Sequence, residues 1–263
     1  MNKHPERGMK LAALAAALIG LLAAFVFLPM LASALLEEFP AYQKWYWPCL
    51  IYGWVVLLPG FAGRRVLDLG CGYGWHCIYA LEHGAAAVTG VDISEKMLAL
   101  AREKTGSGDV RYIRAAMEDV EFPDAAFDVA LSSLALHYVA DFGGMVEKVY
   151  RWLAPGGDFV FSIEHPIFTA YGSQDWYRDE NGDILHFPVD NYFFEGAREA
   201  VFLGERVTKY HHTLTTILDG LLRRGFQLRR VVEPQPPEHM LDMEGMRDEL
   251  RRPMMLLVAA QKA

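Results

Sequence analysis

Residues 65–92 read RVLDLGCGYGWHCIYALEHGAAAVTGVD, and this stretch decides the fold. It begins with a short apolar run, residues 66–69, whose length suits a β-strand that is buried on both faces of a sheet. Three glycines follow at once, in the pentapeptide GCGYG at residues 70–74. Because glycine allows backbone conformations that other residues avoid, the pattern predicts a strand that runs into a tight loop.

The second half of the stretch predicts a helix and another strand. Apolar residues between Trp75 and His83 fit one face of a short helix, and Gly84 would end it. An apolar run at residues 86–91 predicts a second strand, which stops at Asp92. The whole stretch is therefore typical of a β-α-β unit with a carboxylate at the tip of its second strand.

Such a unit forms half of a nucleoside-binding site. Glycines let the main chain pass close to a ligand, and the first turn of the helix offers N–H groups without partners. Asp92 follows the loop by about twenty residues, where a carboxylate can accept both hydroxyls of a ribose. A tight strand-to-helix turn without a ligand is the structural alternative, and the position of Asp92 favours the ligand site.

The glycine spacing separates two classes of nucleoside. Dinucleotide-binding proteins carry G-x-G-x-x-G, whereas the triplet here is G-x-G-x-G and follows Asp68. An acid before a tighter loop suits a ligand that carries an ammonium group and no pyrophosphate. The segments LDLGCGYG (residues 67–74) and GVDIS (residues 90–94) resemble the S-adenosylmethionine-dependent methyltransferases of the Rossmann-like class, in particular their small-molecule branch of type 11/25.

The resemblance extends from about Arg64 to the C-terminus and implies an α/β fold, with a seven-stranded, mostly parallel sheet and an antiparallel last strand. By that resemblance Asp68 would lie beside the amino group of S-adenosylmethionine, Asp92 would hold the ribose and Ile93 would pack on the adenine. The methionine half of the cofactor would be lined by Gly70, Cys71, Gly72 and Gly74.

Further cofactor contacts are expected after the third and fourth strands. The family places adenine contacts after its third strand, where this chain has Met117 and Glu118, although a solvated turn is an equal alternative for Glu118. Ligands in open α/β sheets bind beyond the carboxyl ends of the strands. Ser132 and Ser133 end the predicted fourth strand, residues 127–133, and so we expect them near the cofactor.

Three titratable residues near the same edge are the candidate catalytic groups. Glu164 and His165 follow the predicted fifth strand, residues 158–163, and could serve as a general base or bind the acceptor. His137 follows the fourth strand, in a segment similar to one that lies near the cofactor in the family. Structural roles remain open for each of the three, as a capping residue or a packed, hydrogen-bonded histidine.

Residues 166–210 form an insert rich in aromatic residues and turns. Its position over the cofactor mouth predicts a lid and acceptor pocket, since loops on a rigid sheet carry specificity. A satellite apolar cluster without a ligand is the alternative. Tyr210–His211–His212 is expected to open a helix that runs to Arg224, and His211 or His212 could reach the acceptor. The apolar residues 253–260 predict the antiparallel last strand.

The N-terminal segment, residues 1–63, predicts a membrane anchor of one or two helices before a catalytic domain at residues 64–263. Residues 11–36 carry no charge and are long enough to cross a bilayer, and residues 45–63 form a second uncharged run. Basic residues precede the first run and follow the second, so the two runs would form a hairpin with both of its ends on the cytoplasmic side. A signal peptide, a packing helix for the second run, a misplaced start codon and a soluble cytoplasmic enzyme are alternatives.

Bulk properties exclude some functions. The net charge of −8, with scattered basic residues, gives no nucleic-acid footprint, and the three cysteines lack metal-ligand spacing and indicate a reducing compartment. The sequence therefore predicts an enzyme that transfers the methyl group of S-adenosylmethionine to an oxygen, nitrogen or carbon of a small molecule by SN2 displacement. A nicotinamide-dependent oxidoreductase and a non-catalytic, cofactor-binding membrane protein are the alternatives. The sequence does not predict the oligomeric state.

Overall fold

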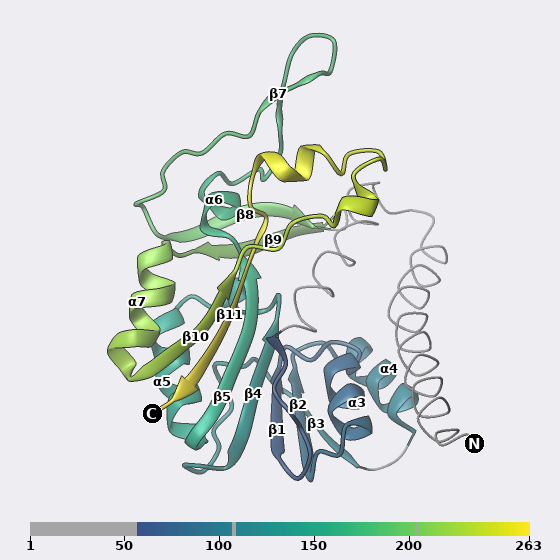
Figure 1. The fold of residues 1–263 in the computed structure, drawn as a ribbon, viewed down its shortest axis with the longest axis vertical. Coiled ribbons are helices and arrows are strands. Elements are labelled where there is room, and N and C mark those ends of the chain that lie inside the picture. Colours follow the sequence, from purple (N-terminus) through teal and green to yellow (C-terminus); the bar gives the residue numbers. More distant parts are fainter. Residues whose placement is uncertain (1–56, 107–108, 203–204) are drawn as a thin grey trace, which may run out of the picture.

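The computed structural model describes residues 57–106, 109–202 and 205–263. A seven-stranded sheet in the order β10-β11-β5-β4-β1-β2-β3 forms its centre (Figure 1). β11 runs antiparallel to both neighbours and all other pairs are parallel, which confirms the predicted fold. The strands are β1 Arg65–Leu69, β2 Ala87–Asp92, β3 Val110–Arg114, β4 Phe127–Ser133, β5 Leu153–Glu164, β10 Phe226–Val232 and β11 Met255–Lys262.

Helices cover both faces of the sheet. The helices α3 and α4 lie on one face and α5 and α7 on the other (Figure 1). Their bounds are α3 Trp75–Glu82, α4 Glu95–Thr105, α5 Phe142–Trp152 and α7 Leu214–Arg224. Val66 of β1 packs with the α3 side, whereas Leu67 and Leu69 pack with the α5 side. The strand is mostly apolar because both of its faces are buried, with Asp68 as its buried charged residue.

Side-chain caps set the helix starts. Ser94 accepts a hydrogen bond at Oγ from the N–H of Met97 (3.3 Å), and Asp141 accepts one at Oδ1 from Gly144 (2.8 Å). The sequence predicts both residues as helix caps, since a short polar side chain before an apolar helical run can satisfy an N–H group that has no partner within the helix, and the structure confirms both. Thr213 begins α7 in the same way.

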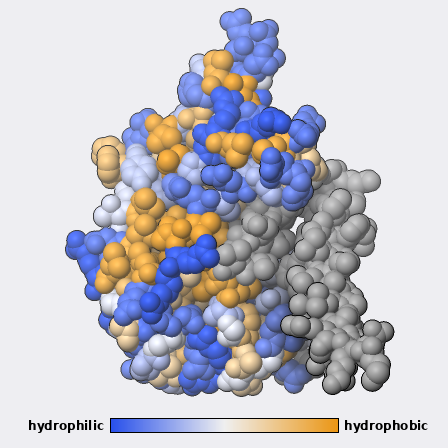
Figure 2. Space-filling view, viewed as in Figure 1, coloured by the Kyte–Doolittle hydropathy of each residue, from blue (hydrophilic) through white to orange (hydrophobic). Residues whose placement is uncertain are grey.

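The insert lies above the carboxyl ends of the strands and contains α6 and two hairpins (Figure 1). These elements are α6 Pro166–Ala170, β6 Tyr177–Arg178, β7 Ile184–His186, β8 Gly196–Phe202 and β9 Glu205–His211. Phe187 connects them at the base, with its ring 5.7 Å from that of Phe168 and 5.4 Å from that of Trp176. The projecting tip of the β6–β7 hairpin is hydrophilic (Figure 2). The aromatic residues therefore stabilise the base of the insert rather than its tip.

Two local predictions were wrong. Tyr210 and His211 end β9 instead of opening a helix, because their strand pairs with β8 and the helix begins only after the Thr213 cap. In the helix after Ser94, the spacing of Met97, Leu98 and Ala101 predicts that all three face the core. Met97 is instead 43% exposed, and the buried face of α4 consists of Leu98 and Ala101.

The N-terminal run of residues 11–36 lies outside the described residues, as does most of the second run. The described end of the second run packs against the domain: Leu57 is 6% and Phe61 3% exposed, and both belong to the apolar cluster on the α3 side. Within the described ranges, no helix combines the length and apolar character that a bilayer crossing requires. Leu57 and Phe61 thus belong to the core of the catalytic domain.

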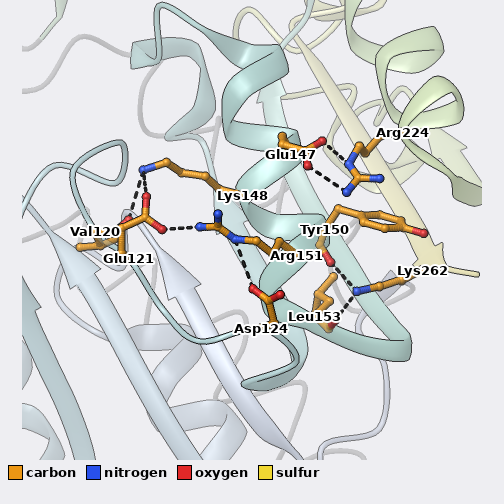
Figure 3. Close-up of polar contacts among 10 residues, drawn as sticks. All are labelled: Val120, Glu121, Asp124, Glu147, Lys148, Tyr150, Arg151, Leu153, Arg224 and Lys262. Atoms are coloured by element: carbon orange, nitrogen blue, oxygen red, sulfur yellow. Dashed lines mark hydrogen bonds and ion pairs between the residues drawn. The ribbon is translucent and has the colours of Figure 1, made fainter.

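A network of charged side chains on α5 connects it to its surroundings (Figure 3). Lys148 donates to the carbonyl oxygens of Glu118 (2.6 Å) and Val120 (3.3 Å), which fixes the loop after β3. Lys262, on β11, donates to the carbonyl oxygens of Tyr150 (2.8 Å) and Leu153 (2.7 Å). These contacts hold α5 against the sheet on the side away from α3.

Ion pairs also belong to this network, among them Lys148 with Glu121 and Arg151 with Asp124. Arg151 pairs with Glu121, and Arg224 of α7 pairs with Glu147 of α5 (Figure 3). The remaining short elements are the 3-10 helices η1 Leu136–Tyr138, η2 Glu238–Met240 and η3 Asp248–Arg251. Of these, η1 follows β4 and so lies at the edge of the sheet where ligands of open α/β folds bind.

Candidate active site

The glycine loop between β1 and α3 lies against the tip of β2. The N–H groups of Gly70 and Cys71 both donate to the carbonyl oxygen of Val91, at 2.8 and 2.9 Å. The three glycines have φ angles of +73°, +53° and +81°, in the left-handed region that favours glycine. The loop therefore needs glycine for its backbone conformation as well as for close approach.

The three glycines face different surroundings. A Cβ on Gly70 would lie 2.3 Å from Cβ of Ala135, and a Cβ on Gly74 would lie 2.3 Å from the hydroxyl oxygen of Tyr112. A Cβ on Gly72 would meet no atom of the described residues within 4 Å. Gly70 and Gly74 thus allow the loop to pack, while Gly72 borders an open cradle.

Asp92 turns its carboxylate toward this loop. Its Oδ2 accepts a hydrogen bond from the N–H of Gly72 (2.8 Å), and its Oδ1 accepts one from the N–H of Ser94 (2.8 Å). Each carboxylate oxygen can accept a further bond, so both can also reach the hydroxyls of a ribose. Ile93, beside it, is 68% exposed and offers an apolar surface at the same edge.

Asp68 is fully buried beneath the loop. Its Oδ2 accepts from the Cys77 thiol at 3.5 Å, whereas its Oδ1 has no hydrogen-bond partner within the described part of the chain. Burial, opposed by the Cys77 bond and increased by the charge of Asp92, raises the pKa of Asp68 to about 7. Nearby His76 does not supply a compensating charge, because burial lowers its pKa to about 3. A cationic ligand group beside Oδ1 would satisfy this carboxylate.

S-adenosylmethionine fits these observations. Its ammonium group would supply the positive charge that Asp68 lacks, its ribose would use Asp92, and the open side of Gly72 leaves room for the ligand backbone. The cradle thus satisfies both requirements of the predicted cofactor, at residues that lie close together in the sequence.

The other predicted cofactor residues lie nearby with different surroundings. Met117 borders the loop, its Cε lying 3.4 Å from where a Cβ of Gly70 would be. Glu118 is exposed, and Ser133 Oγ lies 3.4 Å from Ser162 Oγ. Ser132 is buried and donates its hydroxyl proton to the carbonyl oxygen of Leu69 at 2.9 Å, a bond between neighbouring strands.

A second polar group lies beyond the carboxyl end of β5. Glu164 accepts from Lys209 Nζ at Oε1 (2.6 Å) and from Gln174 Nε2 at Oε2 (2.7 Å). Lys209 Nζ also donates to Gln174 Oε1 at 3.0 Å. Glu164 and Lys209 are only 5% and 3% exposed. We call Glu164, Gln174, Lys209 and His137 the acceptor cluster.

The electrostatics of this cluster give its two candidate catalytic groups, Glu164 and His137, different charge states. Burial alone would raise the pKa of Glu164, but an imidazolium at His137, the charge of Lys209 and the hydrogen bonds from Lys209 and Gln174 oppose it, and the net shift is downward. Burial lowers the pKa of His137 to about 4, although the charge of Glu164 opposes this shift. At neutral pH, therefore, Glu164 is ionised and His137 is uncharged.

His137 is the cluster member with an unused nitrogen. It is 3% exposed, and its Nδ1 has no hydrogen-bond partner among the described residues. The adjacent Tyr138 remains a neutral donor, because burial and the charge of Glu164 raise its pKa to about 12. A neutral imidazole with a free nitrogen can accept a proton; burial makes it a weaker base than a free imidazole, and the charge of Glu164 partly offsets this effect.

The remaining histidines make structural contacts. His165 Nδ1 caps α6 by accepting from the N–H of Ile167 (3.1 Å), and its Nε2 lies 3.0 Å from Glu233 Oε1. His211 lies between the Thr169 hydroxyl and the Tyr192 carbonyl, both at 2.8 Å. His212 Nε2 lies 3.0 Å from the carbonyl oxygen of Val139.

Sequence reasoning missed Lys209 and Gln174. A signal existed for Lys209: it alternates with Val207 and His211 along β9, so a lysine occupies an inward position of a half-buried strand. Gln174 gave no such signal. It lies in a turn with a φ of +55°, which no sequence pattern here predicts.

Comparison with known proteins identifies the family. The methyltransferase domain model matches residues 67–161. A crystal structure from Listeria monocytogenes, provisionally described as an S-adenosylmethionine dependent methyltransferase, is 52% identical, with a TM-score of 0.79 over 82% of this chain and 97% of that one. The S-adenosylmethionine dependent methyltransferase from Mesorhizobium loti is 42% identical, with a TM-score of 0.75 over 81% of this chain and 98% of its own.

A partial match adds one named activity. The malonyl-[acyl-carrier protein] O-methyltransferase of Pectobacterium atrosepticum is 32% identical over 47% of this chain and 48% of its own length. The agreement with the two solved structures, by contrast, extends over nearly all of each and decides against the nicotinamide alternative. The chain therefore belongs to the S-adenosylmethionine-dependent methyltransferases of the Rossmann-like class, and it is an enzyme whose cofactor is S-adenosylmethionine.

Proposed function

We propose that this enzyme methylates an uncharged, proton-bearing group of a small molecule, a hydroxyl or a neutral amine, and that His137 removes the proton. One observation carries the proposal: a buried, uncharged imidazole with an unpartnered Nδ1 lies next to an ionised carboxylate, Glu164, at the edge of the sheet where the cofactor cradle lies.

The cofactor residues have separate proposed roles. Asp92 holds the ribose, Asp68 pairs with the ammonium group and the loop around Gly72 follows the methionine half. Ile93 and Met117 are the apolar contacts of the adenine, with Glu118, Ser133 and Ser132 at the edge of the site. When bound, S-adenosylmethionine supplies an electrophilic methyl group on a sulfonium. The protein mainly aligns the acceptor with it and excludes water.

The acceptor must lose its proton as the new bond to the methyl group forms. His137 accepts this proton at Nδ1 and becomes an imidazolium. Glu164, already ionised, stabilises that charge, and Tyr138 offers a hydroxyl donor to the acceptor. General-base assistance of this kind contributes about 10²- to 10⁴-fold to the rate.

Charge balance in the cluster favours an uncharged acceptor. Lys209 matches the charge of Glu164, and both oxygens of Glu164 already accept hydrogen bonds. A buried carboxylate or ammonium group of a ligand would therefore find no unmatched charge, and burial of an unpaired charge is costly. Glu164 and His165 were both considered as bases from the sequence; we propose instead that Glu164 stabilises the imidazolium of His137 and that His165 caps α6.

Labelled methyl transfer tests this proposal. The purified enzyme is incubated with S-adenosylmethionine carrying a labelled methyl group and matched sets of phenols, amines and carboxylic acids. We expect product from hydroxyl or amine acceptors, with kcat lowered about 10²-fold or more in His137→Ala. Turnover of carboxylic acids alone, with kcat unchanged in His137→Ala, would overturn it, because a carboxylate has no proton to remove.

The anchor is a separate proposal. Residues 11–36 tether the catalytic domain to the cytoplasmic face of a membrane, which is supported by the length of this uncharged run. Of the second run, only the end from residue 57 is assigned to the catalytic domain, because Leu57 and Phe61 pack in its core. We expect the full chain to stay with membranes after carbonate extraction. Release into the supernatant would contradict the tether.

A further inference from the structure

Both partners of Glu164 come from the insert. Lys209 lies on β9, and Gln174 lies in the turn between α6 and β6. The three side chains contact one another pairwise, at 2.6, 2.7 and 3.0 Å. Glu164 itself ends β5, so these contacts connect the insert to the edge of the central sheet.

The backbone of Gln174 is strained at this point. Its φ of +55° lies in the left-handed region, which is unfavourable for residues with a Cβ. Its N–H donates to the carbonyl oxygen of Tyr171 at 3.1 Å, which closes the turn. Strain of this kind persists only where the surroundings enforce it, and here it brings the amide to Glu164 Oε2.

We infer that Lys209 and Gln174 are positioning residues, which hold Glu164 ionised and oriented beside His137 when the insert is packed on the sheet. This inference rests on the proposed role of His137. Neither residue needs to touch the acceptor, because each acts through Glu164. Among the described residues, the charges that act on Glu164 are those of His137 and Lys209, and the charges that act on His137 are those of Glu164 and Lys209. Tyr138 also feels the charge of Glu164.

The physical reason is the burial of Glu164. A carboxylate that is 5% exposed would take up a proton if its positive partner were removed, because burial raises its pKa. A protonated Glu164 no longer stabilises an imidazolium at His137. The insert therefore supplies the charge that keeps the carboxylate of the sheet in its active form.

The first experiment compares the pH dependence of kcat/KM for the wild type, Lys209→Met and Gln174→Leu. We expect the acid limb to move up by at least about one pH unit in Lys209→Met, by less in Gln174→Leu, and to return in Lys209→Arg. Thr208→Val is the matched control, since Thr208 is the exposed neighbour on β9 and bonds Glu199 at 2.8 Å. A merely structural role would lower the rate without moving the limb.

The second experiment needs no turnover. Infrared difference spectra against Glu164→Gln follow the protonation of Glu164 with pH in the full chain without acceptor. We expect Glu164 to titrate at higher pH in Lys209→Met, and this result would support the inference even if His137→Ala kept full activity. An unchanged titration in folded Lys209→Met would overturn it.

A double variant covers the case in which Lys209→Met does not fold. Replacing both charges in Glu164→Gln/Lys209→Met leaves no unpaired buried charge. If Lys209 acts through Glu164, the double variant will have the kcat of Glu164→Gln alone. A further fall in kcat of tenfold or more in the double variant would contradict the inference.

Discussion

The cofactor cradle and the acceptor cluster lie at the same edge of the sheet but are built in opposite ways. The cradle is made from one local stretch, with backbone groups as its main partners and Asp92 only twenty positions from Gly72. The acceptor cluster is made from side chains of four separate segments, and Lys209 is 45 positions from Glu164. Its geometry therefore depends on how the insert packs on the sheet.

This difference predicts different responses to mutation. A local, backbone-built cradle tolerates changes elsewhere in the chain and fails when a loop residue gains a side chain. A cluster of buried charges fails when one partner is removed, because the other is left unpaired. Changes in the two regions should accordingly separate cofactor affinity from the rate of methyl transfer.

The largest expected effect is on the chemical step. His137→Ala should lower kcat by about 10²- to 10⁴-fold, since general-base catalysis is lost. The affinity for S-adenosylhomocysteine should change by less than about threefold, because His137 belongs to the other region. Steady-state kinetics and calorimetry measure the two quantities. If kcat and the affinity for S-adenosylhomocysteine fell by the same factor, the two regions would not act separately.

A matched pair of glycine substitutions distinguishes binding from packing within the cradle. Both glycines have a positive φ, so both substitutions strain the backbone. In Gly72→Ala the new Cβ also projects into the open cradle, with no described atom within 4 Å of it, so the cofactor affinity should fall by about tenfold or more while the domain still folds. In Gly74→Ala the Cβ would lie 2.3 Å from the Tyr112 hydroxyl, so the unfolding free energy should fall by about 1–3 kcal/mol. Thermal unfolding measures the stability of each variant and calorimetric titration measures its cofactor affinity. A larger loss of stability in Gly72→Ala than in Gly74→Ala, or a loss of affinity alone in Gly74→Ala, would contradict these assignments.

Cofactor affinity should also depend on pH through Asp68. With a pKa of about 7, Asp68 ionises between pH 6 and 8, so the affinity for S-adenosylhomocysteine should rise by about tenfold over this range. Because the pKa is raised in the folded state, the stability that Asp68 contributes is greatest below its ordinary pKa and is lost as the pH rises through 7. Asp68→Asn should remove the pH dependence of the affinity and that of the stability. If either persisted in this variant, it would belong to another titratable group.

The smallest effect is expected at an exposed ion pair whose residues belong to neither region. Glu121 pairs with Lys148 and Arg151 on the outer surface of α5, where its side chain is 58% exposed (Figure 3). Exposed pairs contribute little because water screens them. Glu121→Gln should therefore leave kcat/KM and cofactor affinity within about twofold of the wild type. A larger change in either would mean that α5 influences the site.

Sequence reasoning succeeded where the determinants are local. The spacing of the glycines and Asp92 predicted the β-α-β unit and the cofactor, and the polar residues Ser94 and Asp141 predicted two helix starts. It failed at Tyr210 and His211, where pairing with β8 outweighed the helical pattern. Long-range pairing of this kind leaves no mark in the local sequence.

The acceptor cluster illustrates the same limit. Glu164 and His137 could be named from their places after strands, but their states could not, because Lys209 and Gln174 set the charge of Glu164 from a distant insert. His165 looked equivalent to Glu164 in the sequence, and only the contact with Ile167 identifies it as a helix cap.

Calorimetric titration with S-adenosylhomocysteine tests the central claim, a cradle built for a sulfonium nucleoside, most directly. The wild type should bind this ligand at one site and should not bind NADH. In Asp92→Ala the loss of charge-assisted hydrogen bonds to the ribose should weaken binding by roughly 1.5 to 3 kcal/mol, or about 10- to 100-fold. Undiminished affinity in Asp92→Ala, or preferential binding of NADH by the wild type, would contradict the claim.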